Sequence, residues 1–170
     1  MMIGLNLFIT CILVFALLTV TESVASALPS SCKSINGLPD PKCTPGATNP
    51  QVTQSTIGQS VCVPGFTKTI RPSTSFTNPL KTQLMKSYGL YGVAKSYELD
   101  HLISLELGGA PSSVANLWPE SWTGVNNAHT KDKFENYLHR QVCKDKMTLS
   151  EAQHEISTNW VYYWTKAGKP

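Results

Sequence analysis

The side chains best suited to chemistry lie in one largely apolar stretch, residues 97–109. A carboxylic acid and an imidazole are adjacent there, as Asp100 and His101. An imidazole titrates near neutral pH, so His101 can act as a general base toward water. A carboxylate is a suitable ligand for a hard divalent cation such as Mg²⁺. The pair therefore supplies two groups needed to hydrolyse a phosphodiester, and a second oxygen ligand on a following helix would complete a one-metal site.

The residues around this pair predict one strand of a hairpin, over residues 96–107. In such a strand His101 shares a face with apolar side chains, and Asp100 lies on the opposite face. Neighbouring side chains of a regular strand point apart, so the pair can converge only at a strand end or a bulge. The apolar side chains on the face of His101 are Leu99, Ile103 and Leu105.

Local signals predict short extended pieces at 61–63 and 66–70, followed by a first helix. That helix has Asn78 as its N-cap, Pro79 at the first helical position and Gly89 at its end. One face of it carries apolar side chains at four-residue spacing and is expected in the core. The residues of this face are Leu80, Leu84 and Tyr88.

Two further helices are predicted in the last third of the chain. One spans 127–142, and the other begins at a capping box formed by Thr148 and Glu151. Apolar side chains repeat along one face of each helix, and these are Phe134, Leu138 and Val142, then Ala152, Ile156, Trp160 and Tyr163. His139 and His154 are expected on the helix surfaces. The tryptophans are expected in the core or at its rim, at positions 118, 122, 160 and 164.

The first 27 residues are typical of a signal peptide. Residues 7–20 are almost entirely apolar, and Ala25 and Ala27 form a pattern that suits cleavage after Ala27. The leader has no basic residue before the apolar run, so a retained membrane anchor is the alternative. Residues 28–60 are then an irregular arm rich in Pro, Gly and Ser, tied down by cysteines rather than by packing, and residues 61–170 form the main domain. Loss of the leader removes only Glu22 and raises the formal charge of +3 by one.

The cysteines agree with export. One of the five lies in the leader. An even number in a small exported domain indicates two disulfides, for which three connectivities are possible. The four remaining cysteines are Cys32, Cys43, Cys62 and Cys143.

Several motifs together point to a family. The Asp100–His101 pair is followed by Gly108 and Gly109, then Asn116 and a helix. This arrangement resembles the HNH, or His-Me finger, endonuclease motif, in which a two-stranded hairpin and a helix surround one divalent ion. The chain is similar to small exported bacterial-type HNH-like proteins over nearly all its mature length, with further matching stretches at 43–46, 61–65, 71–72, 88–89, 116–120, 127–128, 131–135, 142–143 and 152–153.

The resemblance implies an α+β fold: a small disulfide-containing domain with a ββα-metal hairpin-helix core, an additional helix on its N-terminal side and a C-terminal helix. It implies Asp100 as a metal ligand and His101 as the general base. Asn116 would brace the loop behind the site and hold His101 in place. The remaining metal ligand would come from the following helix, where Asn127 is favoured and His129 is the alternative.

Other charged residues near the motif have two interpretations each. Arg71 and Lys131 are candidates for binding substrate phosphates, although a solvated face also explains them. Glu98, Asp132 and Glu135 are candidates for orienting the metal site from behind the ligands. A solvated strand-edge carboxylate is the alternative for Glu98, and a surface charge cluster for the helix residues.

The expected function is that of a secreted, metal-dependent nuclease that hydrolyses DNA or RNA. It would use one divalent cation, Mg²⁺ or else Mn²⁺, and would act as a monomer away from the membrane. No base-reading element is apparent, so sequence specificity is expected to be low. A non-catalytic binding or structural protein on a degenerate HNH scaffold is the alternative, and a hydrolase of other phosphoesters is a third hypothesis.

Overall fold

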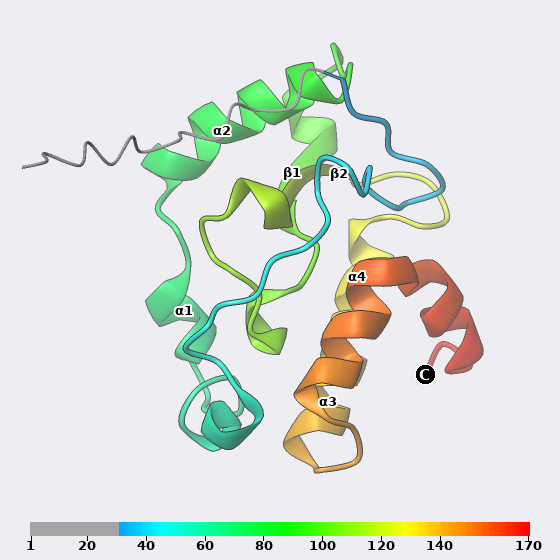
Figure 1. The fold of residues 1–170 in the computed structure, drawn as a ribbon. Coiled ribbons are helices and arrows are strands. Elements are labelled where there is room, and N and C mark those ends of the chain that lie inside the picture. The colour runs from blue at the N-terminus through cyan, green and yellow to red at the C-terminus, as the bar shows by residue number, and fades with distance from the viewer. Residues whose placement is uncertain (1–30) are drawn as a thin grey trace, which may run out of the picture.

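The computed structural model describes residues 31–170, so the predicted leader lies outside the described residues. The described part is a small α+β domain with two disulfides (Figure 1). Its helices are α1 (Phe66–Ile70), α2 (Thr74–Ser87), α3 (Ala128–Cys143) and α4 (Leu149–Lys166), its strands are β1 (Tyr97–His101) and β2 (Leu117–Ser121), and 3-10 turns span Gln54–Gln59, Ala94–Ser96, Leu105–Leu107 and Val114–Asn116. Within residues 31–170, no helix has the length and apolar character that a bilayer crossing requires.

The two strands form an antiparallel hairpin with a long connection. Its register runs from Tyr97 opposite Ser121 to His101 opposite Leu117. The predicted strand over 96–107 is too long, because β1 ends at His101. After that residue the side chains are almost all buried, and a 3-10 turn replaces the alternation of a half-exposed strand. Asp100 and His101 therefore lie at the end of a strand, where their two side chains can point toward one site.

Two helices differ from their predicted form. Residues 66–70 are the short helix α1, because the amide of Phe66 donates to Val63 and that of Lys68 to Gly65, which closes a helical turn after the Pro64–Gly65 bend. The next helix, α2, begins at Thr74, so Pro79 lies inside it. Ser73 provides an earlier start, since its carbonyl accepts from two amides of the first turn. The predicted core face of α2 is confirmed: Leu80, Leu84 and Tyr88 are buried.

The largest part of the core lies between α3 and α4, which Figure 1 shows side by side. Asn127 caps α3, and Thr148 and Glu151 form the predicted capping box of α4. The predicted apolar faces are confirmed except at one position: Trp164 is buried in place of Tyr163. Asn159 has a non-helical backbone (φ −163°, ψ 76°). Trp164 continues the four-residue spacing of Ala152, Ile156 and Trp160 beyond this kink.

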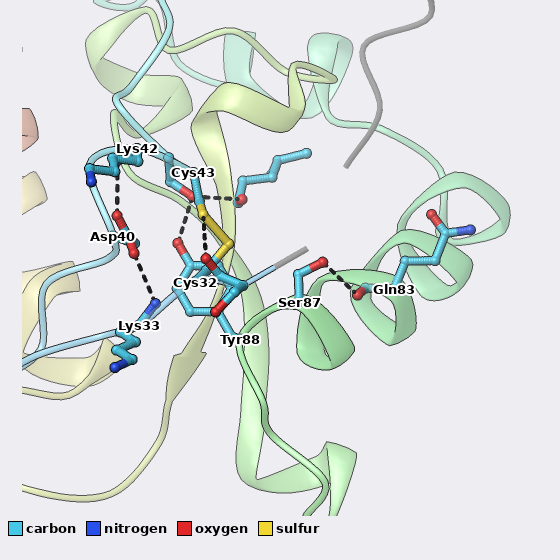
Figure 2. The surroundings of a disulfide bond; sticks show 11 residues. Cys32, Lys33, Asp40, Lys42, Cys43, Gln83, Ser87 and Tyr88 are labelled. Atoms are coloured by element: carbon cyan, nitrogen blue, oxygen red, sulfur yellow. Dashed lines mark hydrogen bonds between the residues drawn. A yellow bond between two sulfur atoms is a disulfide. The ribbon is translucent and has the colours of Figure 1, made fainter. Parts of the chain in front are cut away.

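The disulfides join Cys32 to Cys43 and Cys62 to Cys143, which selects one of the three connectivities. Figure 2 shows the first bond beside the end of α2. The amide of Cys32 donates to Ser87 there, and the carboxylate of Asp40 accepts from two nearby amides.

The arm over residues 31–60 is held by packing as well as by a disulfide. Val52 is buried in the core of α3 and α4, and Thr48 pairs with Gly109 in an isolated bridge. Gly46 donates its amide to Ala115. The arm therefore lies against the connection between the two strands and covers the rear of the hairpin.

Candidate functional site

His101 is held as a neutral base at the end of β1. Its side chain is buried, and Nε2 lies 2.9 Å from the carbonyl oxygen of Pro111. A carbonyl only accepts, so Nε2 carries the hydrogen and Nδ1 keeps its lone pair. In the described part of the chain, Nδ1 has no hydrogen-bond partner. Burial lowers the pKa of His101, and Arg71 and Lys131 act in the same direction. The ring is therefore unprotonated at neutral pH.

Asn116 fixes the main chain that follows His101. It is fully buried, and its Oδ1 accepts from the Ile103 amide at 2.9 Å. Its Nδ2 donates to the carbonyls of Ile103 and Ala110, at 2.9 and 3.2 Å. Ala110 precedes Pro111, the partner of the imidazole. The side chain of Asn116 thus braces both ends of the loop behind His101.

Gly109 is required for the close approach of this loop. A Cβ atom at that position would lie 1.7 Å from the carbonyl oxygen of Ile103, and the contact is with backbone that cannot move aside cheaply. Gly108 before it has a left-handed backbone (φ 72°), which favours glycine. The Gly-Gly turn of the motif therefore has a steric origin.

We expect Asn116→Ala to lower the free energy of unfolding by about 3 kcal/mol, because it leaves several buried backbone groups unpaired. Urea denaturation followed by circular dichroism measures this change. Asn136→Ala is the matched control, since Asn136 is exposed on α3 and its loss is expected to change stability by less than about 0.5 kcal/mol. Equal urea midpoints for Asn116→Ala and Asn136→Ala would contradict the role of Asn116 in bracing the loop.

Lys131 forms the centre of a buried ion cluster. It is 1% exposed, and its Nζ donates to Asp100 Oδ2 at 2.7 Å and to the His101 carbonyl at 2.8 Å. Its third donor goes to Glu135. Lys131 therefore lies neither on a solvated helix face nor within reach of a substrate phosphate, and its ammonium joins α3 to the end of β1.

The cluster shifts the pKa values of its members. Burial alone would lower the pKa of the Lys131 ammonium, but the carboxylates of Asp100, Glu135 and Glu120 outweigh burial and raise it. Burial raises the pKa of the Glu135 carboxyl despite the contact with Lys131. One fixed positive charge is thus surrounded by an excess of carboxylates.

Three carboxylates converge on the face of the hairpin nearest this lysine. Glu98 and Glu120 are directly opposite each other on the two strands, and Asp100 follows Glu98 on the same face. Each of the three offers an oxygen within 4.8 Å of the others. Carboxylate oxygens are the ligands that Mg²⁺, Mn²⁺ and Ca²⁺ prefer, so this group fits a hard divalent cation.

The same convergence changes the acidity of these groups. Burial, together with the neighbouring Asp100 and Asp132, raises the pKa of Glu98 to about 7. Burial and Asp100 raise the pKa of Glu120 well above its usual value. Each pKa exceeds that of the unfolded chain, so folding favours the protonated carboxyls.

Without divalent cations, we expect the protein to become less stable as the pH rises from 6 to 8. A raised carboxyl pKa contributes stability that is complete below the unfolded value and is lost as the pH passes the folded value. For Glu98, which is partly exposed, the loss is about 1 kcal/mol, or a fall in Tm of about 3 °C. Thermal unfolding in EDTA at pH 6, 7 and 8 measures it. Glu98→Gln should flatten the dependence, and a Tm that rises over this range would contradict the prediction.

His101 and Glu98 open onto a basic pocket of about 450 Å³ between α2 and β1. Lys81 donates its Nζ to the Tyr97 carbonyl at 2.6 Å and keeps other donors. Arg71 is exposed and close enough to His101 to lower its pKa. The cationic and aromatic residues that line this pocket are Arg71, Lys81, Lys95, Tyr97 and Trp122.

The two predicted helix ligands are engaged elsewhere. Asn127 Oδ1 accepts from the Thr130 amide at 3.0 Å, and its Nδ2 donates to the Gly124 carbonyl at 2.7 Å, so the side chain serves as the cap of α3. The ring of His129 is exposed, with its centroid 4.7 Å from that of Trp122. His129 is not among the side chains that converge with Asp100, which are Glu98 and Glu120.

Other histidines and charged residues are placed as follows. Asp132 is exposed on α3, and burial followed by Asp100 raises its pKa. His139 was predicted on the helix surface and is half-buried, with its Nε2 2.8 Å from the Val61 carbonyl oxygen, because α3 packs there against the segment before α1. His154 is exposed as predicted. His139 lies beside Cys62 and Cys143, but the disulfide removes both thiols as metal ligands.

Glu120 is the principal site residue without a predicted role. Its place depends on the register of the hairpin, which sets Glu120 opposite Glu98, and the burial of β2 on both faces leaves no alternation that would single it out. Lys95 was also missed, because its place at the pocket depends on the fold of the α2–β1 loop. Comparisons of the chain with protein-family models, with curated proteins and with solved structures give no match.

Proposed function

We propose that the protein is a secreted, metal-dependent nuclease that hydrolyses phosphodiester bonds in DNA or RNA. The observation that carries this proposal is the state of His101. Its Nε2 is committed to Pro111, its Nδ1 keeps a lone pair, and the ring lines an open pocket with basic residues at its wall. A buried, neutral imidazole beside a carboxylate and an open basic pocket suits activation of water at a phosphodiester.

In this mechanism Nδ1 of His101 accepts a proton from the attacking water. Pro111 holds the opposite ring nitrogen, so the imidazole keeps the tautomer that this step needs. Arg71 and Lys81 bind the phosphate oxygens and orient the scissile bond. Asp100 would hold a divalent cation through the carboxylate oxygen that Lys131 leaves free. Such a cation, when bound, supplies positive charge to the phosphate and the leaving oxygen.

The basic side chains of the pocket recognise phosphates rather than bases, so we propose low sequence specificity. The two disulfides suit an oxidising, extracellular-like environment, which agrees with a secreted nuclease.

The test is degradation of plasmid DNA and of a structureless RNA in Mg²⁺, with and without EDTA. We expect degradation in Mg²⁺, its loss in EDTA and its return when excess Mg²⁺ is added. Undiminished degradation in EDTA would refute the metal requirement. If the plasmid DNA and the RNA both remain intact in Mg²⁺ and in Mn²⁺, the nuclease proposal is refuted.

One observation favours the alternative, a non-catalytic binding protein. The side chain of Asn127 is used to cap α3, and His129 is exposed, so neither predicted helix ligand is held in place for a cation by a contact with Asp100. A scaffold of this kind would bind nucleic acid through the basic pocket and release it intact. A gel-shift assay run beside the degradation assay separates the two functions.

A further inference from the structure

We propose that the divalent cation is bound between Glu98, Asp100 and Glu120, so that the hairpin itself, rather than the first turn of α3, provides the protein ligands. This inference rests on the proposed function for its purpose, but cation binding can be measured without any nucleic acid. It assigns a metal-binding role to Glu120 and changes the role of Glu98 from a supporting residue to a ligand.

The register of the hairpin brings these carboxylates together. Glu98 and Glu120 are cross-strand partners, and like charges directly opposite each other destabilise a sheet. The three oxygens lie within 4.8 Å of one another. Opposite ligands are about 4.2 Å apart around Mg²⁺ and about 4.8 Å apart around Ca²⁺. The three oxygens are therefore close enough to one another to share one cation.

Glu120 gives the second, independent reason. Its side chain is 1% exposed, and among residues 31–170 neither of its carboxylate oxygens has a hydrogen-bond partner. A buried carboxyl group without a partner is unfavourable in either protonation state, and the neighbouring acids make its ionised form more so. A cation among the three carboxylates would satisfy the atoms of Glu120 that the protein leaves unpaired.

Lys131 does not already fill this role for Glu120. Its three N–H groups are used by Asp100, the His101 carbonyl and Glu135. Lys131 bonds to one oxygen of Asp100, and the other oxygen has no hydrogen-bond partner in the described part of the chain. Asp100 can therefore bind the ammonium and a metal ion at the same time.

The site is reachable and close to the proposed base. Glu98 lines the open basic pocket together with His101. Glu120 lines a second pocket, of about 360 Å³, together with Tyr97 and Trp118. A cation that enters past Glu98 would lie beside the pocket in which His101 activates water.

The experiment is a Mn²⁺ titration of the full chain without nucleic acid, read from the loss of the free Mn²⁺ signal in electron paramagnetic resonance. We expect wild type to bind one Mn²⁺, and Glu120→Gln and Glu98→Gln to weaken binding by at least about tenfold. Glutamine keeps the shape and removes the charge, so both variants should fold, which circular dichroism verifies. His129→Ala and Asn127→Ser are the matched controls, because serine preserves the helix cap, and they should bind like wild type.

Two results would overturn this site: no Mn²⁺ binding by wild type, or binding lost in His129→Ala or Asn127→Ser but kept in Glu120→Gln. The nuclease proposal fails differently. A protein that binds Mn²⁺ through Glu120 and leaves plasmid and RNA intact would refute only the function. Degradation in Mg²⁺ together with wild-type Mn²⁺ affinity in Glu120→Gln would refute only the site.

Discussion

Replacement of His101 by glutamine should reduce the rate of nucleic-acid hydrolysis by about 10²–10⁴-fold, the usual contribution of a general base. Glutamine retains an N–H donor for the Pro111 carbonyl but has no counterpart of Nδ1. The change therefore removes the proton acceptor and keeps the contact that holds the loop. Initial rates on plasmid DNA and on RNA measure the effect.

The control for this variant is His154→Gln, an equivalent change at an exposed position of α4. It should hydrolyse both substrates at the wild-type rate. Circular dichroism and thermal unfolding of His101→Gln show whether the fold is retained. A folded His101→Gln protein with the wild-type rate would eliminate the imidazole as the base.

The lowered pKa of His101 also predicts the form of the pH profile. Burial keeps the ring neutral below the ordinary pKa of about 6.5. Its proton-accepting form is therefore populated in mildly acidic solution, and the acidic limb of the rate profile should have its midpoint below pH 6.5.

Lys131→Met should lower the free energy of unfolding by about 3–5 kcal/mol, the range found when one partner of a buried ion pair is removed. Methionine fills a similar volume but leaves Asp100 and Glu135 without their counter-charge. It also leaves the carbonyl oxygen of His101 without the hydrogen bond that Lys131 donates to it. Denaturant unfolding at pH 8 measures the change.

The destabilisation of Lys131→Met should be smaller at pH 6, because the carboxyls then take up protons in the folded protein. Lys133→Met, at an exposed position of the same helix, is the control and should cost less than about 0.5 kcal/mol. A loss below about 1 kcal/mol for Lys131→Met at both pH values would show that the ion cluster contributes little.

The parts of the fold that follow from the sequence are those specified by local signals. The N-cap at Asn127, the capping box of α4 and the four-residue spacing on both helices are short-range patterns, and α3 and α4 match them. The strand over 96–107 was overextended because the burial of Leu102 depends on Trp118 and the N-terminal disulfide. The start of α2 was misplaced because Ser73 competes with Asn78 as a cap.

The residues of the candidate site likewise fall into those that the sequence motif reveals and those that only the tertiary fold brings together. Adjacent residues such as Asp100 and His101 could be found from the motif, and a strand end beside them was required by geometry. Lys131 and Glu120 depend on the packing of α3 and on the register of the hairpin, which no local pattern fixes. Helical spacing makes Lys131 and Glu135 neighbours, but it does not reveal that both are buried.

The bond between Cys62 and Cys143 closes a covalent ring that contains α1, α2, the whole hairpin and α3. Tyr91, in the loop between α2 and β1, is 86% exposed and offers a protease a point of attack. A single cut there would open the ring without releasing either piece, so Arg71 and Lys81 on one piece would stay tethered to His101 on the other. A chain nicked in the loop between α2 and β1 would therefore remain one covalent molecule.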